Sequence, residues 1–110
     1  MRNLRAHLIA LLFAAAACAA PSAEQYKGAI EVVGTVHMLQ LEGGCWVLQV
    51  GEDLDDIQVY LLDGELLPRL MTEGATATLI IRPNPKAASV CQVGTVAEVL
   101  EIIDFDEPQE

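Results

Sequence analysis

The sequence predicts an all-β domain of five strands with one short helical segment. Two observations predict this class. Several stretches rich in Val, Ile and Thr alternate apolar with polar residues, which is the pattern of half-buried strands. Glycine, proline and acidic residues separate these stretches at short intervals, as turns do. The chain has 110 residues, and the part with this pattern is long enough for only one small core.

The strand pattern occurs in five stretches, which are residues 29–41, 45–50, 57–62, 75–82 and 90–103. Gly34 inside the first stretch indicates a bulge or a sharp bend, and Gly94 is a candidate interruption of the last. Between the third and fourth stretches, four apolar residues lie at helical spacing: Leu66, Leu67, Leu70 and Met71. Pro68 limits this segment to a short or irregular turn, and Gly74 fits the position just after a helix. Residues 83–86 have the composition of a loop.

This order of elements is that of an OB-type Greek-key barrel, in which three strands, a helix and two more strands follow one another. A bent first strand and a small core agree with a five-stranded barrel. An open β-meander with one helix and an SH3-like barrel are the alternatives. The predicted domain covers residues 28–104, and residues 105–110 form an acidic tail.

The first residues resemble an export signal. Arg2 and Arg5 precede an apolar stretch of about ten residues that ends in alanines, which predicts a signal peptide over residues 1–17 or 1–19. The sequence allows two processing routes. Ala15-Ala16-Ala17-Cys18 resembles the lipobox of bacterial lipoproteins, which would make Cys18 the lipidation site, whereas ordinary cleavage would follow Ala19. Residues 18–27 have no apolar period and are expected to form a flexible tether.

The leader predicts an exported protein of the periplasm, and a lipidated Cys18 would anchor it to the outer membrane. In that oxidising compartment Cys45 and Cys91 are expected to form a disulfide. The alternative to a disulfide is that both cysteines are free, buried thiols, as expected for a protein of the cytosol.

The charge of the mature part excludes one class of partner. Once the leader is removed, four basic residues remain against all 16 acidic ones, a formal charge of about −12. A field of this sign repels phosphate backbones, so nucleic acid is not an expected partner. An unknown protein, a small ligand or a cation remains open, and membrane contact is expected only through the lipid anchor.

The sequence offers little for catalysis. His37 is the only histidine after the leader, and neither Ser22 nor Ser89 lies in a strand–turn–helix elbow. The disulfide would occupy both remaining cysteines. The spacings typical of redox, haem and zinc sites are also missing from the sequence. We therefore expect no enzyme and no cofactor.

Two binding sites are conceivable. Calcium accepts several carboxylates from a flexible loop, so the acidic stretch with Glu52, Asp53, Asp55 and Asp56 is a weak candidate metal site, although it lacks the EF-hand spacing. The face of the second and third strands, where OB-folds bind ligands, could be lined by Trp46, Leu48 and Tyr60. Inward packing of Trp46 and Tyr60 is an equally open interpretation.

Short motifs carry a resemblance to a known group. They are Gly34-Thr35-Val36, Glu42-Gly43-Gly44 followed by Trp46, Leu67-Pro68 before Gly74, and Gly94-Thr95-Val96. In these the domain resembles small prokaryotic OB-like domains of uncharacterised proteins, many of them exported or lipid-anchored. Members usually have an aromatic residue directly after the Glu-Gly-Gly turn, where this chain has Cys45. The resemblance implies a fold and no reaction. We expect a non-enzymatic binding or interaction module of the bacterial envelope, with a calcium-type cation-binding protein as the alternative.

Overall fold

The computed structural model describes residues 26–41 and 43–109. The predicted signal peptide, the lipidation site Cys18 and most of the predicted tether lie outside the described residues. Within the described ranges, no helix has the length and apolar character needed to cross a membrane.

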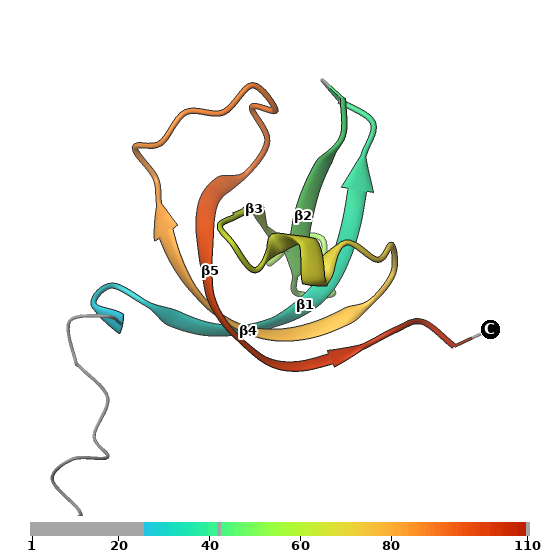
Figure 1. Cartoon of the computed structure of the whole chain (residues 1–110). Helices are drawn as coiled ribbons and strands as arrows, with labels where there is room; N and C mark the ends of the chain where they lie inside the picture. Colours follow the sequence, from blue (N-terminus) through green and yellow to red (C-terminus); the bar gives the residue numbers. More distant parts are fainter. Residues whose placement is uncertain (1–25, 42, 110) are drawn as a thin grey trace, which may run out of the picture.

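Five strands form a closed barrel in the order β1-β2-β3-β5-β4 (Figure 1). The strands are β1 (Ile30–Leu39), β2 (Cys45–Val50), β3 (Gln58–Asp63), β4 (Thr76–Asn84) and β5 (Thr95–Asp106). The β3–β5 pair is parallel, and the other four pairs are antiparallel. With the 3-10 helix η2 (Leu67–Leu70) between β3 and β4, this confirms the predicted all-β, OB-like barrel.

Every strand except β2 differs from its predicted bounds by at least one residue. Strand β4 continues through Pro83 and Asn84, which the composition assigned to a loop. The ladder of β4 with β1 ends at Ile81, and Pro83 pairs only with Ala97 of β5. Proline is tolerated here because its missing N–H removes no bond to a second neighbour.

Strand β5 begins and ends later than predicted. It starts at Thr95, so residues 90–94 belong to the loop between β4 and β5. It ends at Asp106, within the stretch assigned to the acidic tail, because Phe105 pairs with Ala77 and packs against the core. The predicted interruption at Gly94 is therefore the boundary between loop and strand.

Gly34 marks the point where β1 passes from one neighbour to the other. It pairs with Ala77 of β4, and the next residue, Thr35, pairs with both Gln49 of β2 and Thr76 of β4. A Cβ atom on Gly34 would lie 2.5 Å from the carbonyl oxygen of Gln49 and 2.8 Å from Cγ of Leu48. The strand curves strongly around the barrel here (Figure 1), and close approach of neighbouring chains explains the glycine.

The η2 segment closes one end of the barrel. Pro68 occupies its first turn, where a missing N–H costs no hydrogen bond, and Leu70 is fully buried in the core. Gly74, predicted to follow a helix directly, lies three residues beyond the helix cap Met71, in the turn before β4. Its N–H donates to the carbonyl of Val36 at 2.8 Å, which fastens this turn to β1.

The barrel interior holds the main core. Its fully buried members come from β1, β2, β4, β5, η2 and the turn before β4: Val36, Leu48, Leu70, Ala75, Leu79, Ile81 and Ala97. Strand β3 adds Tyr60 and Leu62, which are 7% and 4% exposed. A second, smaller cluster lies on the outer face of β2 and β3 and contains Cys45, Val47 and Leu61. Both faces of these two strands are thus covered.

Tyr26 connects the chain before β1 to β5. Its hydroxyl donates a hydrogen bond of 3.2 Å to Oε2 of Glu101. The negative charge of Glu101 and this hydrogen bond raise the pKa of Tyr26 above 10.0, because both favour the neutral phenol.

We expect Glu101→Gln to lower the pKa of Tyr26, which an NMR pH titration of the Tyr26 ring would measure. A folded-state pKa above the unfolded one stabilises the fold below pH 10, and this contribution disappears as the pH rises through the folded pKa. Glu107→Gln, which removes a charge outside this contact, is the control. An unchanged Tyr26 pKa in Glu101→Gln would contradict the assignment.

Candidate functional site

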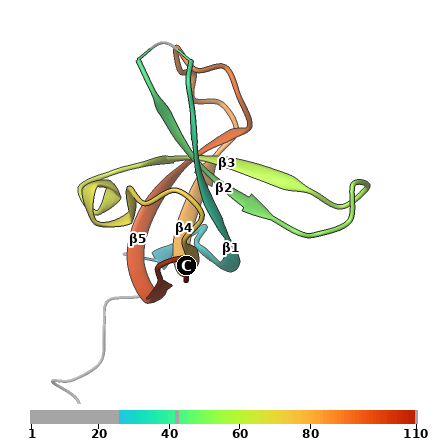
Figure 2. The ribbon, with the colours of Figure 1, turned by 90° about the vertical axis from the view of Figure 1, so that its right-hand side faces the viewer.

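The loop between β4 and β5, residues 85–94, covers the outer face of β2 and β3. Cys91 and Val93 from this loop, together with Val96, pack against the outer cluster of Cys45, Val47 and Leu61. In Figure 2 the orange loop stands beside the end of β1 and the start of β2. The surface on which OB-folds bind ligands is therefore partly occupied by the chain itself.

Cys45 and Cys91 lie at disulfide-bonding distance, with their Cα atoms 6.2 Å apart. Cys45 is the first residue of β2, and Cys91 lies in the β4–β5 loop rather than at the start of the fifth strand, where the sequence placed it. The side chain of Ser89 supports the loop locally, because its Oγ accepts the N–H of Cys91 at 3.1 Å. This pair connects the start of β2 to the β4–β5 loop.

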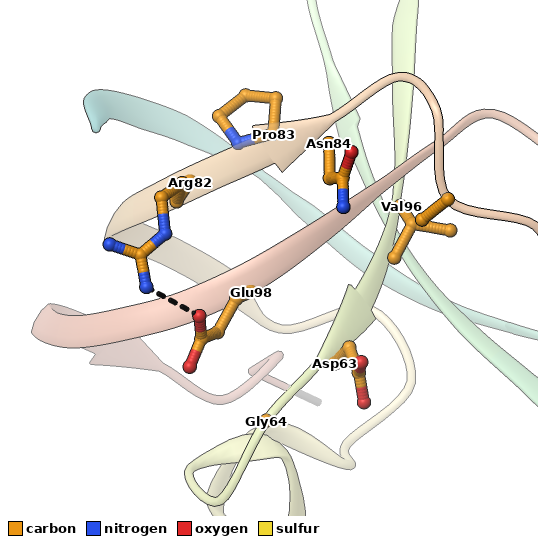
Figure 3. Close-up of a pocket in the computed structure, with 8 residues that line it drawn as sticks. Asp63, Gly64, Arg82, Pro83, Asn84, Val96 and Glu98 are labelled. Carbon is orange, nitrogen blue, oxygen red and sulfur yellow. Dashed lines mark hydrogen bonds and ion pairs between the residues drawn. The ribbon is translucent and has the colours of Figure 1, made fainter. Parts of the chain in front are cut away.

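Beside the covered face, three strands place charged side chains in a row. The register pairs Asp63 of β3 with Glu98 of β5, and Glu98 with Arg82 of β4. All three side chains point to the outer surface, since their neighbours Leu62, Ala97 and Ile81 point into the core. Nη2 of Arg82 donates to Oε1 of Glu98 at 2.7 Å (Figure 3). The row carries two carboxylates and one guanidinium.

These residues line a hollow of about 330 Å³, which we call the charged pocket. Figure 3 shows Asp63, Glu98 and Asn84 around it, with Pro83 above the strand of Arg82. The floor and walls are completed by Gly64, Ala87 and Val96.

A second hollow of about 270 Å³, which we call the apolar pocket, adjoins the first and shares Asp63 and Val96 with it. Most residues that line it are apolar in type, among them Trp46, Leu61, Leu62, Leu67, Ala88 and the Cys45–Cys91 pair, while polar atoms contribute nearly half of its surface. The two hollows meet at these shared residues beside the β4–β5 loop, and we call them together the groove.

The apolar pocket lies where β2 and β3 separate. Their ladder ends at the pair Val47–Leu61, so Cys45 and Trp46 have no pairing partner in β3. Likewise, Leu62 and Asp63 pair with β5 but not with β2. Figure 2 shows the start of β2 and the end of β3 diverging from their crossing point. The gap between them borders the groove.

The predicted ligand residues do not form an outer face. Leu48 is fully buried and Tyr60 is 7% exposed, and both belong to the barrel core. The hydroxyl of Tyr60 donates to Oε1 of Gln58 at 2.9 Å. Trp46 also packs against the core, but it is only half-buried and reaches the apolar pocket. Of the three, Trp46 alone is available to a ligand.

The acidic loop between β2 and β3 carries the predicted metal residues on the surface. Glu52, Asp53, Asp55 and Asp56 are all exposed. In the described parts of the chain, no group of three or more potential ligand side chains converges on one point. The loop thus offers separate carboxylates and no assembled coordination site.

His37 is engaged at the surface. Its Nδ1 lies 2.9 Å from Oε2 of Glu73, in the turn before β4. Among the hydrogen bonds of the described residues, Ser89 is engaged with the Cys91 N–H, and neither it nor the acidic residues of the β2–β3 loop contact His37. The described geometry therefore brings His37 together with a single carboxylate.

Sequence reasoning missed Asp63, Arg82 and Glu98. Each is a charged residue of the kind that commonly occupies the outer face of a strand. Only the pairing of β3 with β5 and of β5 with β4 brings the three together. The available signal was position: all three occupy outward places in strands whose inward neighbours are apolar.

Compared with known protein families, curated proteins and solved structures, the chain shows no match.

Proposed function

We propose that this protein is a non-catalytic binding module of the bacterial cell envelope. Its leader would export it to the periplasm, and Cys18 would either anchor it to the outer membrane or be removed with the leader. The observation that carries the binding role is the groove beside the β4–β5 loop, formed by two adjoining hollows. It combines apolar residues with a few polar groups that come from three strands, which is the composition of ligand sites.

The framework of the groove suits binding. A bridge between Cys45 and Cys91 would hold the β4–β5 loop against β2, so that the walls keep their shape before a ligand arrives. Preformed walls reduce the ordering cost of binding. A periplasmic location would favour this bridge, since disulfides persist in oxidising compartments.

The charge restricts the ligand. Two of the three charged residues in the groove are carboxylates, and the mature chain carries about four basic residues against 16 acidic ones. A cationic or neutral ligand fits this field, whereas nucleic acid does not.

A thermal-shift panel tests this function on the mature protein with divalent cations, glycans, oligonucleotides and basic peptides. We expect basic peptides or a neutral ligand to raise the melting temperature and oligonucleotides to have no effect at physiological salt. Ligand at 100 times its Kd stabilises by about 2.7 kcal/mol, which is readily measured in a small domain.

Two results would contradict the proposal. One is stabilisation by Ca²⁺ alone that disappears in Asp53→Asn/Asp55→Asn, which would support the cation-binding alternative. The other is tight oligonucleotide binding at physiological salt, which would overturn the charge argument. Asp104→Asn, on the outer face of β5, controls for a change of net charge.

A further inference from the structure

We propose that the groove binds an extended, basic segment of a partner protein. A lysine or arginine side chain of the segment would lie between Asp63 and Glu98, and a neighbouring apolar side chain would enter the apolar pocket. This inference rests on the proposed function and names the class of its partner.

The first argument is charge. In the row of Asp63, Glu98 and Arg82, the guanidinium is 2.7 Å from Glu98 on one side, while Asp63 is the register neighbour of Glu98 on the other. Among the ion pairs of the described residues, none involves Asp63. Like charges on directly opposite positions of paired strands repel, so a cation placed between the two carboxylates relieves this repulsion.

The second argument is the neighbouring apolar surface. The charged pocket and the apolar pocket share Asp63 and Val96, so a ligand that contacts one carboxylate can also contact Trp46 and Leu67. A free metal ion would use only the carboxylates and would leave this surface uncovered. A chain with basic and apolar side chains fits both parts.

The third argument is the main chain. Because the β2–β3 ladder ends at Val47–Leu61, four strand residues border the gap without a partner across it: Cys45, Trp46, Leu62 and Asp63. In a strand, N–H and C=O groups point to the two sides at alternate residues, so part of this backbone faces the gap. An extended segment can pair with such strand ends, and its side chains then reach the adjoining pockets.

Other occupants fit less well. A second copy of this chain carries the same strong negative charge and would be repelled, and so would an anionic membrane surface. A basic partner segment has the opposite charge and is attracted.

Fluorescence anisotropy on the full mature protein tests the inference with three labelled seven-residue probes. One alternates Val and Lys, one alternates Gly and Lys, and one alternates Val and Glu. We expect the Val/Lys peptide to bind, the Gly/Lys peptide to bind at least about tenfold more weakly, and the Val/Glu peptide not to bind. Binding of the Val/Lys peptide should weaken as salt rises, because exposed charges are screened.

Two variants locate the site. Asp63→Asn should weaken Val/Lys binding by about tenfold, the usual order for one lost hydrogen bond to a charged group. Asp104→Asn makes the same charge change on the outer face of β5 and should leave the affinity within about twofold. Ala88→Trp, at an exposed position that lines the apolar pocket, should also reduce binding. All three positions are exposed, and melting curves of the variants would confirm that they fold.

The inference is overturned if the Gly/Lys peptide binds as tightly as the Val/Lys peptide, or if Asp63→Asn and Ala88→Trp bind like the unchanged protein. It is also overturned if none of the peptides binds. Stabilisation by a glycan or another neutral ligand in the thermal-shift panel would then leave the binding function standing, so the two proposals fail separately.

Discussion

Replacing Cys45 and Cys91 together with alanine should lower the free energy of unfolding by about 4 kcal/mol. A bridge between them closes a loop with a sequence separation of 46 residues. In the chain-entropy model, closing this loop lowers the conformational entropy of the unfolded chain and so stabilises the folded state by about 4 kcal/mol. For a domain of this size, the melting temperature should fall by about 15 °C or more.

The structure adds a local consequence to this loss. Without the bridge, noncovalent contacts alone hold the β4–β5 loop over the outer face of β2 and β3, among them the packing of Val93 against the outer cluster. When the loop opens, Val47 and Leu61 lose their cover, and both are now less than a tenth exposed. We therefore expect faster amide hydrogen exchange in β2 and β3 than in β1 and β4, whose core face does not depend on the loop.

Urea unfolding of protein from an exporting host measures this effect, and intact mass shows whether the two thiols have lost their hydrogens. Reductant should shift the unfolding midpoint of the unchanged protein toward that of the double variant. The same reductant should not affect the double variant itself, which is the control. Equal midpoints of unchanged protein with and without reductant would show that the bridge does not stabilise the domain.

The element order was readable from the sequence for local reasons. Val- and Ile-rich alternation predicts strands, and Pro68 limits the helical segment to a single short turn. The OB-type strand order was one of three arrangements compatible with these elements, and the pairing of β5 between β3 and β4 distinguishes it. The ends of the strands were less predictable. Pro83, for example, belongs to β4 because it pairs on one side with Ala97 of β5, and its sequence context does not show this pairing.

The residues of β2 do not indicate which of its side chains point into the barrel. Cys45-Trp46-Val47-Leu48 is a continuous apolar run, and such a run does not say which alternate set points inward. The structure buries both sets, because the barrel interior covers one face and the β4–β5 loop covers the other. Leu48 therefore lies in the core, and Trp46 is the β2 residue of the predicted ligand face that reaches the groove.

Gly34→Ala should destabilise the barrel by about 3 kcal/mol, although its backbone conformation suits any residue. The reason is space. The new methyl group would lie 2.5 Å from the carbonyl oxygen of Gln49, which is backbone in the neighbouring strand, and 2.8 Å from Cγ of Leu48. Leu48 is fully buried, so it has no free volume into which to move.

The destabilisation should appear as faster unfolding together with weaker β1–β2 pairing. Because Thr35 pairs with both β2 and β4, a shift of β1 away from Gln49 also strains the closure of the barrel. Val33→Ala is the matched control, since Val33 lies one residue away and is 55% exposed. It should change the free energy of unfolding by less than about 1 kcal/mol. Equal urea midpoints for Gly34→Ala and Val33→Ala would show that β1 can move aside, and that the barrel closes without the tight crossing at Gly34.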